Sequence, residues 1–239
     1  NGEVYNKWLE YTGKKIYEGY GQTESTIICG NFMEYCDIRP GSMGKPNPLY
    51  DVEVLTPNNK PVPAGEVGEL CIHVEGVRPF GLLMGYHKDI ALTSEAFEGG
   101  VYHTGDNVYM DADGYVWFVG RKDDIIKTAG YRVSPFEVES VLQQHPAVME
   151  CAVIGVEDAK RGMSVKATIV LSPGYDKKYP KEMEIELSTF AKEKTAIYKC
   201  PRIFEFGKEL PKTISGKIRR VEIREKDKVK DIERIKQDF

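Results

Sequence analysis

Short runs in which apolar and polar residues alternate dominate the first half of the chain. Residues 52–55, 69–74 and 115–119 each show the period-two pattern of a β-strand, and turn sequences rich in Gly, Pro, Asn and Asp separate them. Short strands joined by tight turns predict a small antiparallel barrel-like or sandwich subdomain. A helix is expected ahead of them over residues 4–13, because glycine commonly follows a helix C-terminus and Gly13 stands there.

The second half alternates helical and strand patterns. Ser134-Pro135-Phe136-Glu137 is a capping box with proline at the first helical position, and an apolar helical face follows it. Strands are predicted at 148–156, 165–171 and 203–206, an amphipathic helix at 182–194, and a mixed-charge helix or frayed end at 222–239. The order α-β-β-α-β is typical of a small α+β domain.

Residues 120–133 separate these halves, and they are first charged, then apolar, then punctuated by glycine. We therefore predict two domains, residues 1–122 and 123–239, with a linker at 121–124. The fold class is α/β and α+β: the end of a larger domain that carries the barrel-like subdomain, followed by a separate α+β domain.

Composition narrows the function classes. The 239 residues include 41% hydrophobic and 29% charged residues, which is ordinary for globular proteins, and the net charge of -4 gives no basic field for nucleic acid. The sequence has no run of about 18 apolar residues that would span a membrane. Five cysteines without a C-x-x-C pair and four scattered histidines disfavour a disulfide framework or a zinc site, so a reducing compartment is expected. The start lacks methionine and a signal region, which predicts a piece of a longer chain.

Three polar segments carry candidate chemistry. Glycines on both sides of Tyr20 would let the backbone approach a flat ligand, Thr23 could bind a phosphate, and Glu24 could hold Mg2+. Asp106 follows a turning glycine and suits paired ribose hydroxyls, and Lys217 lies in a loop with Pro and Gly, where it could meet a phosphate or carboxylate. Taken singly, each has a plainer interpretation: a tight polar turn, an aspartate that stabilises its own turn, and a solvated basic loop.

The order of the motifs is more specific than any one of them. Tyr20-Gly21-Gln22-Thr23-Glu24, Gly68-Glu69-Leu70, Tyr102-His103-Thr104-Gly105-Asp106, Gly120-Arg121-Lys122-Asp123-Asp124 and Pro211-Lys212-Thr213-Ile214-Ser215-Gly216-Lys217 follow one another. In that order they resemble the adenylate-forming superfamily across essentially the whole chain. Glu18-Gly19 before the first motif, and Gly130 to Glu139, resemble medium-chain acyl-CoA synthetases most.

The resemblance implies a two-step reaction. A carboxylate attacks ATP to give acyl-AMP and pyrophosphate, and coenzyme A then displaces AMP, while the C-terminal domain rotates between the steps. Glu24 would hold Mg2+, Asp106 and Arg121 would bind the ribose, and Thr23, Glu24 and Lys217 would be catalytic. Adenine and the α-phosphate would be lined by Gly19, Tyr20, Gly21, Gln22 and Thr23.

The remaining implied roles concern the hinge and the second step. Asp123 matches the hinge, and Lys217 would bridge the carboxylate and the α-phosphate in the first step. Gly130, with Tyr131 and Arg132, would lie beside the pantetheine tunnel. On weaker local matches, Arg161, Lys192 and Arg202 would meet the phosphates of coenzyme A.

Other expectations follow from the family. Acetyl-CoA synthetases have a tryptophan at the position of Gly21, so glycine at this position implies a medium-chain, branched or aromatic acyl group. The family's N-terminal phosphate loop is missing, so the partners are a carboxylic acid, ATP, coenzyme A and the upstream part of the same enzyme; apolar surface left on residues 1–120 would favour an oligomer. The alternatives are a non-catalytic nucleotide- or CoA-binding fragment and a peptide-synthetase adenylation domain. The expected location is the cytoplasm, or the mitochondrial matrix in a eukaryote.

Overall fold

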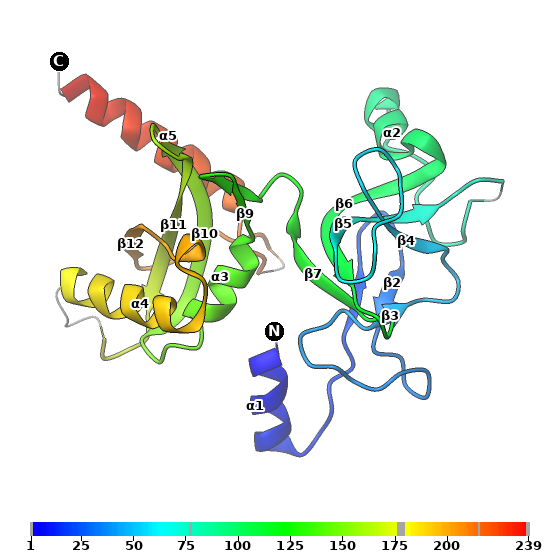
Figure 1. Cartoon of the computed structure of the whole chain (residues 1–239), viewed down its shortest axis with the longest axis horizontal. Helices are drawn as coiled ribbons and strands as arrows, with labels where there is room; N and C mark the ends of the chain where they lie inside the picture. Colours follow the sequence, from blue (N-terminus) through cyan, green and yellow to red (C-terminus); the bar gives the residue numbers. More distant parts are fainter. Residues whose placement is uncertain (1, 77, 176–179, 215, 238–239) are drawn as a thin grey trace. The chain divides into compact units, whose positions relative to one another are not determined.

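The chain folds into two compact units, Asn1–Asp123 and Asp124–Phe239 (Figure 1). A computed structural model describes residues 2–76, 78–175, 180–214 and 216–237. The junction lies one residue beyond the boundary at 122/123 that the sequence predicted. Each unit has its own core, and each is described by itself below.

The first unit contains two open antiparallel sheets. Its elements are α1 (Gly2–Thr12), β1 (Gly19–Gly21), β2 (Ile27–Gly30), β3 (Lys45–Pro46), β4 (Val52–Leu55), β5 (Val67–His73), α2 (Ile90–Ala96), the 3-10 helix η1 (Glu98–Gly100), β6 (Val101–Met110) and β7 (Val116–Arg121). The sheet orders are β1-β2-β3 and β4-β5-β6-β7. The barrel-like expectation is therefore wrong for the described strands, because four strands are too few to close on themselves.

Strand β5 separates two groups of side chains in this unit. Leu70 and Ile72 face the main core, together with residues of β4, β6 and β7. Cys71 points to the other face, where it packs with Leu55 and Val101. This alternation follows from the period of two along a strand, and it also directs Glu69 to the face of Cys71.

The second unit is built on a long β-hairpin. Its elements are β8 (Ile126–Thr128), β9 (Tyr131–Val133), α3 (Pro135–Leu142), β10 (Val148–Asp158), β11 (Gly162–Leu171), α4 (Pro180–Lys194), the 3-10 helix η2 (Ile197–Lys199), β12 (Ile203–Gly207) and α5 (Arg220–Gln237). The sheet order is β10-β11-β8-β9, and β12 runs parallel to β11.

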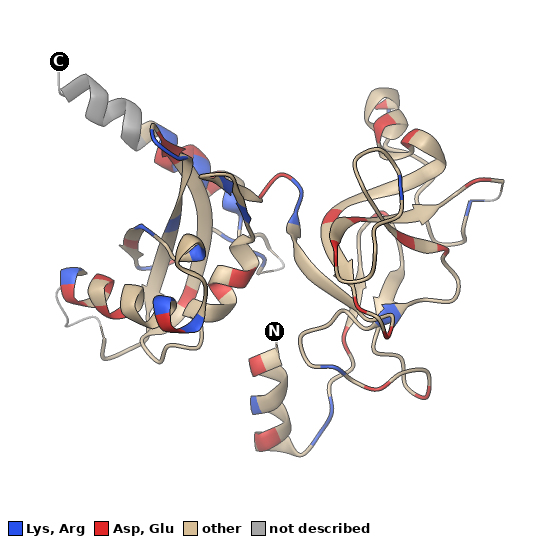
Figure 2. Ribbon diagram, in the orientation of Figure 1, with Lys and Arg blue, Asp and Glu red and all other residues tan. Residues whose placement is uncertain are grey.

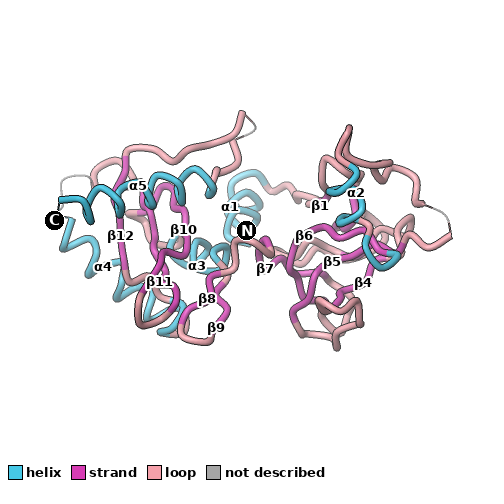
Figure 3. Tube along the Cα trace, turned by 90° about the horizontal axis from the view of Figure 1, so that it is seen from above, coloured by secondary structure: helices cyan, strands magenta, loops and turns pink. Residues whose placement is uncertain are grey.

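Helices cover both faces of this sheet (Figures 1 and 3). Cys151 and Val153 of β10 face α3 and α4 in the larger core. Ala152 and Ile154 of the same strand face the opposite side, where Ile223 of α5 packs. A strand that is buried on both faces needs apolar residues at successive positions, which residues 151–154 supply.

Most elements agree with the sequence predictions. The predicted cap is confirmed, because the Ser134 hydroxyl accepts a hydrogen bond from the Glu137 amide at 3.1 Å. Helix α1 ends before Gly13, which has a φ of 66°. Helix α2, which Asp89 caps through the Leu92 amide, was not predicted from the sequence. Neither was the hairpin β8–β9 inside the predicted junction.

Acidic and basic residues are interspersed over each unit (Figure 2). This agrees with the net charge of -4 and with the lack of a basic field. Among the described residues, no helix has the length and apolar character needed to cross a membrane.

Candidate active site

Strands β1 and β6 bring three predicted residues together around one carboxylate. The Tyr20 hydroxyl donates to Oδ2 of Asp106, and Nε2 of Gln22 donates to the same oxygen at 2.8 Å. Nε2 of Gln22 also donates to the Thr104 carbonyl at 2.8 Å, and its Oε1 accepts from the Tyr102 hydroxyl at 2.8 Å. Tyr20 and Gln22 thus tie the glycine-rich segment to the strand of Asp106, and Gln22 does so through three separate contacts.

Arg121 completes this group from the end of β7. Its Nη1 donates to the Thr104 carbonyl at 3.0 Å and lies 3.4 Å from Oδ1 of Asp106. Its Nε lies 3.5 Å from the carboxylate of Asp123, the predicted hinge residue. The side chain of Arg121 is 47% exposed whereas that of Asp106 is 5% exposed, so the arginine presents the group to solvent.

Burial dominates the electrostatics of the group. It raises the pKa of Asp106 above its ordinary value, although hydrogen bonds from Tyr20, Arg121 and Gln22 oppose the rise. Burial and the adjacent Asp106 charge also raise the pKa of the Tyr20 phenol far above its usual range, so Tyr20 stays a hydrogen-bond donor. Burial works against the charge of Arg121, but Asp106 and Asp123 raise its pKa overall.

A bulge in β6 sets the direction of Asp106. Gly105 has a φ of 71°, a left-handed conformation that favours glycine, and its amide donates to Oε1 of Glu69 at 2.9 Å. The Asp106 amide donates to the Thr104 hydroxyl at 3.1 Å. The plainer interpretation, that Asp106 stabilises its own turn, is therefore wrong. Thr104 and Glu69 hold the turn, and the Asp106 carboxylate binds other side chains.

Glu24, the predicted Mg2+ ligand, is half-buried and accepts a hydrogen bond at Oε1 from the Tyr86 hydroxyl at 3.2 Å. Mg2+ is often bound by one or two carboxylates together with phosphate oxygens and water, so a single oriented carboxylate fits that ion. Thr23 is exposed in the turn beside it, and Gln22 and Ser25 close that turn with mutual hydrogen bonds. Thr23 and Glu24 therefore lie on a fixed turn whose polar groups are accessible.

Gly21 is required by the local backbone. A Cβ atom at this position would lie 2.3 Å from the Thr26 carbonyl oxygen. Gly19 is less restricted, because its Cβ would meet only the Ile27 side chain at 3.2 Å. The glycine at position 21 therefore has a structural reason besides any effect on an acyl pocket, and a larger residue would shift β1.

In the second unit, Lys217 lies on a small hairpin. The Thr213 amide donates to the Lys217 carbonyl at 2.8 Å, and the Lys217 amide donates to the Thr213 hydroxyl at 3.1 Å. Gly216 has a φ of 83°, which turns the chain, and Lys217 itself is exposed. Ser215 lies outside the described residues. The motif thus holds the backbone of a lysine while leaving its side chain in solvent.

The residues predicted to meet coenzyme A lie in three places in this unit: the hairpin β8–β9 with its neighbour Arg161, the last turn of α4, and the residue before β12. Gly130 is in the turn of the hairpin β8–β9, where Ala129 and Gly130 have φ values of 48° and 85°. Two positive φ values are the signature of a type I′ turn, which favours Asn-Gly, Asp-Gly or Gly-Gly, so the Ala-Gly pair did not reveal the hairpin in the sequence. The Ala129 amide donates to the Arg161 carbonyl at 2.9 Å, so Arg161 lies beside the turn.

Next to Gly130, the exposed ring of Tyr131 stacks on Tyr198 with 4.2 Å between centroids. Arg132 follows on β9 and is exposed. Lys192, in the last turn of α4, and Arg202, just before β12, are exposed too. The structure thus groups Gly130, Tyr131, Arg132 and Arg161 at one hairpin and places the other two on separate elements.

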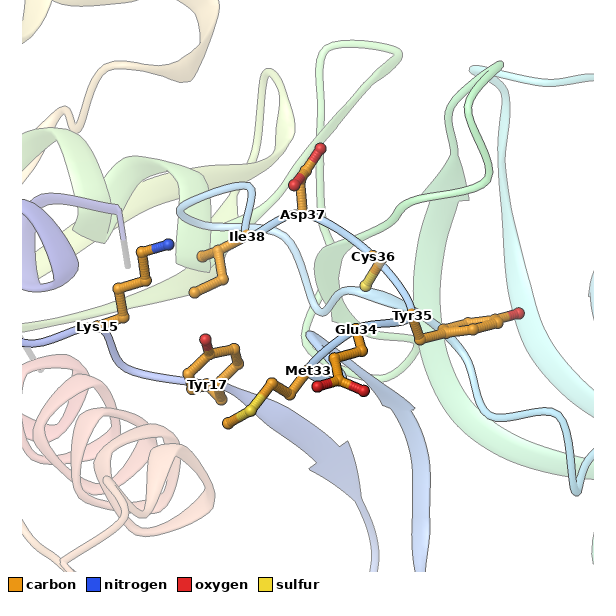
Figure 4. A pocket seen from close by; sticks show the side chains of 8 residues that line it. All are labelled: Lys15, Tyr17, Met33, Glu34, Tyr35, Cys36, Asp37 and Ile38. Carbon is orange, nitrogen blue, oxygen red and sulfur yellow. The ribbon is translucent and has the colours of Figure 1, made fainter.

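A surface hollow of about 390 Å³ lies elsewhere in the first unit (Figure 4). Lys15, Tyr17 and residues 33–38 line it. None of the predicted site residues is in its lining, and several of the lining side chains, among them Met33 and Tyr35, are mainly exposed. It is therefore separate from the group around Asp106.

Two family profiles match the chain. Residues 1–87 match the AMP-binding enzyme family, and residues 137–217 match the AMP-binding enzyme C-terminal domain. The chain belongs to the AMP-binding enzyme family. Its two matched segments fall in the two structural units, one in each.

Relatives within this family are named as acyl-CoA ligases. The mouse protein "Acyl-coenzyme A synthetase ACSM3, mitochondrial" is 49% identical over 227 residues, which cover 95% of this chain and 39% of the relative. "4-hydroxybutyrate--CoA ligase 1" of Metallosphaera sedula is 49% identical over 231 residues, or 96% of this chain and 40% of that protein. The chain thus spans about two fifths of the length of these relatives.

Solved structures of AMP-binding enzymes have the same fold. The anthranilate CoA ligase AuaEII in complex with anthranoyl-AMP matches with a TM-score of 0.86 and 40% identity, covering 97% of this chain and 42% of that one. ATP-bound MatB from Rhodopseudomonas palustris matches with a TM-score of 0.84 and 29% identity, covering 94% and 43%. Both of these solved structures are complexes with a nucleotide or an acyl nucleotide.

Proposed function

We propose that this chain is the C-terminal part of an AMP-forming acyl-CoA synthetase. The enzyme joins a carboxylic acid to ATP, releasing pyrophosphate, and then transfers the acyl group from AMP to the thiol of coenzyme A. The observation that carries the proposal is the group of Tyr20, Gln22, Asp106 and Arg121, held by hydrogen bonds in a chain of the AMP-binding family.

In the first unit, the proposed role of Asp106 and Arg121 is to bind the ribose hydroxyls of the nucleotide. The contact between Oδ1 of Asp106 and Nη1 of Arg121 is long, at 3.4 Å, and a carboxylate oxygen can accept two hydrogen bonds, so Oδ1 could accept a ribose hydroxyl beside the arginine. The Tyr20 ring, whose orientation its bond to Asp106 fixes, would lie against adenine. Glu24 would hold Mg2+, which would neutralise charge on the phosphates of ATP.

In the second unit, Lys217 would act in the first step by stabilising charge that develops on the α-phosphate and the attacking carboxylate. Its exposure supports this role, because a lysine paired within the fold could not reach a substrate. Gly130 and its neighbours Tyr131 and Arg132, together with Arg161, Lys192 and Arg202, would serve the second step by meeting coenzyme A. Asp123 would be the hinge between the steps, next to the boundary of the two units.

The substrate proposed is a medium-chain, branched or aromatic acid. Relatives named for medium-sized or aromatic acids support this class, although the Gly21 argument is weakened by the close Thr26 carbonyl. A direct test is a panel of acids from acetate to octanoate with benzoate, measured by acid-dependent exchange between ATP and pyrophosphate in the complete enzyme. Highest turnover with acetate would contradict the proposed class.

The upstream part of the enzyme is the proposed partner of the first unit. Large apolar side chains there, including Phe80, Met84 and Ile90, are more than 80% exposed, and burial by further protein would remove them from water. The cytoplasm, or the mitochondrial matrix in a eukaryote, is the proposed location; several relatives are named mitochondrial.

The deciding experiment separates the two half-reactions in the complete enzyme. Lys217→Ala should lower acid-dependent exchange by about a thousandfold, the order of effect expected for a lost electrostatic contact to the transition state. Transfer from supplied acyl-AMP to coenzyme A should be kept. Lys212→Ala, on the same hairpin but paired with Glu150 at 2.5 Å, is the matched control and should keep both activities. Equal losses in both variants would refute the role of Lys217.

A second measurement addresses this chain alone. Calorimetric titration with AMP and, separately, with coenzyme A shows which part of the site is complete in 239 residues. Binding of AMP that is lost in Asp106→Asn would support the nucleotide site. Binding of neither ligand would mean that the site needs the upstream part of the enzyme.

A further inference from the structure

Three side chains that the proposed reaction does not use meet on the face of β5 opposite the main core. They are Glu69, Cys71 and His103, and their potential ligand atoms all lie within 4.8 Å of one another. Glu69 and Cys71 are two residues apart on β5, so they share a face, and His103 is the cross-strand partner of Cys71 on β6. Among the described residues, this is the one such group of three His, Cys, Asp or Glu.

The spacing of the three groups resembles the ligand edges of a tetrahedral zinc site. Nδ1 of His103 lies 3.7 Å from Sγ of Cys71 and 3.3 Å from Oε2 of Glu69. Tetrahedral geometry with ordinary zinc bond lengths separates sulfur from nitrogen by about 3.6 Å, and nitrogen from oxygen by about 3.3 Å. The two observed edges therefore need almost no rearrangement to share one ion.

The orientation of His103 supports the same interpretation. Its other ring nitrogen, Nε2, lies 3.1 Å from the Glu98 carbonyl, which can only accept a hydrogen bond. A neutral imidazole that donates from Nε2 to this carbonyl has its lone pair on Nδ1, the ring atom that faces Cys71 and Glu69. Histidines that bind metals characteristically donate their second nitrogen to a carbonyl or a carboxylate in this way.

The carboxylate is held in place as well. Oε1 of Glu69 accepts from the Gly105 amide at 2.9 Å, which leaves Oε2 directed at His103. Nζ of Lys122 lies 3.3 Å from Oε2, but this lysine is 61% exposed. Glu69 itself is only 8% exposed, so Lys122 now balances the charge of a buried carboxylate, and a divalent cation bound at Oε2 would take over that role.

We propose that Glu69, Cys71 and His103 form a binding site for a divalent cation of the zinc class, with a fourth position open to water. The mixed sulfur, nitrogen and oxygen donors select Zn2+ over the hard ions Mg2+ and Ca2+, which prefer oxygen alone. Cys71 is fully buried and His103 is 21% exposed, so the ion would enter from the side of the histidine.

This site is distinct from the proposed Mg2+ ligand Glu24 and does not depend on the proposed reaction. It is nevertheless connected to the nucleotide site, because Glu69 holds the amide of Gly105, next to Asp106. A bound ion would fix Glu69 and thereby the bulge that directs the Asp106 carboxylate. We therefore expect the ion to stabilise the first unit.

The test uses Co2+ as a spectroscopic probe of the whole 239-residue chain. A cysteine thiolate bound to Co2+ gives a charge-transfer band in the near ultraviolet, and a tetrahedral site gives strong visible bands. We expect both to saturate at one ion per chain and to disappear when Zn2+ is added. Cys71→Ser should abolish the charge-transfer band, and His103→Gln should weaken binding at least about tenfold.

Matched controls lie in the same unit. Cys36→Ser changes another thiol and His87→Gln an exposed histidine, and both should keep the wild-type spectrum. Melting curves show that each variant is folded; His103→Gln, at a partly exposed position, keeps the test valid if Cys71→Ser unfolds. The proposal is overturned if wild-type protein shows no thiolate band, if the band survives in folded Cys71→Ser, or if His103→Gln binds Co2+ as tightly as the wild-type protein.

Discussion

Replacing Arg220 by methionine would leave a buried carboxylate without its counter-ion. Arg220 begins α5, and its Nε and Nη2 donate to the two oxygens of Glu139 at 3.1 and 2.6 Å. Glu139 is 5% exposed, and its Oε1 also accepts from the Val153 amide at 2.8 Å. Burial raises the pKa of Glu139 above 4.5, and Arg220 opposes the rise. Arg220→Met therefore removes the main group that keeps Glu139 charged.

The size of the effect depends on pH. An unpaired charge in the interior costs about 3–5 kcal/mol. The folded protein can avoid part of this by protonating Glu139, which costs about 1.4 kcal/mol for each pH unit above the unfolded-state value of 4.5. This cost of protonating Glu139 sets the upper limit of the penalty, which is about 3.4 kcal/mol at pH 7 and about 0.7 kcal/mol at pH 5. Because the variant raises the folded-state pKa further, its penalty is small below 4.5 and grows as pH rises.

The assay must report on the second unit. Both tryptophans, Trp8 and Trp117, lie in the first unit, so their fluorescence is a poor probe. Hydrogen exchange of the amides in α3 and β10 measures the free energy of opening in the right place. We expect Arg220→Met to lower it by about 3 kcal/mol at pH 7 and by about 1 kcal/mol at pH 5.

The control is the double variant Glu139→Gln with Arg220→Met. Without a carboxylate at position 139, the loss should be smaller and should not change between pH 5 and pH 7. A single variant whose penalty is the same at both pH values, or is unchanged by Glu139→Gln, would show that the loss comes from packing of the arginine stem and not from the buried charge.

Three further changes test the local architecture. Gly44→Ala should destabilise the first unit by at least about 3 kcal/mol, since its Cβ would lie 2.0 Å from a backbone carbon of Gly30. Gly114→Ala, at a similar φ but in open space, should cost about 1 kcal/mol. Trp117 fluorescence in urea compares the stability of the two variants, and equal losses would refute the steric argument. Tyr20→Phe should cost about 1.5–3 kcal/mol by the same assay because it removes a bond to a buried charge, and a neutral effect would count against that bond. Ser134→Ala should lower protection of α3 from hydrogen exchange by about 1 kcal/mol, with Ser134→Asp retaining it.

Several elements could be predicted from the sequence because contacts between residues close along the chain determine them. The cap at Ser134 and the turn before β7 depend on residues within four positions of one another, so a short window contains all the information. The hairpin β8–β9 was missed because Ala129-Gly130 is not a preferred turn pair and because its strands have only three residues each. The barrel-like interpretation failed because closure depends on how many strands pair, which a local pattern does not contain.

The sequence by itself determined the order of the motifs, and from it two domains and the candidate residues were predicted, because residue type and spacing along the chain carry that information. Only the tertiary structure decided which of them meet. Gln22 bonds to Thr104 and Asp106 across more than 80 positions, and the thiol and imidazole of Cys71 and His103 become neighbours through strand register. Scattered cysteines and histidines formed no zinc pattern in the sequence, since Cys71 and His103 are neighbours in space and not along the chain. Pairing register and burial are collective properties of the packed sheets, and for this reason they appear only after folding.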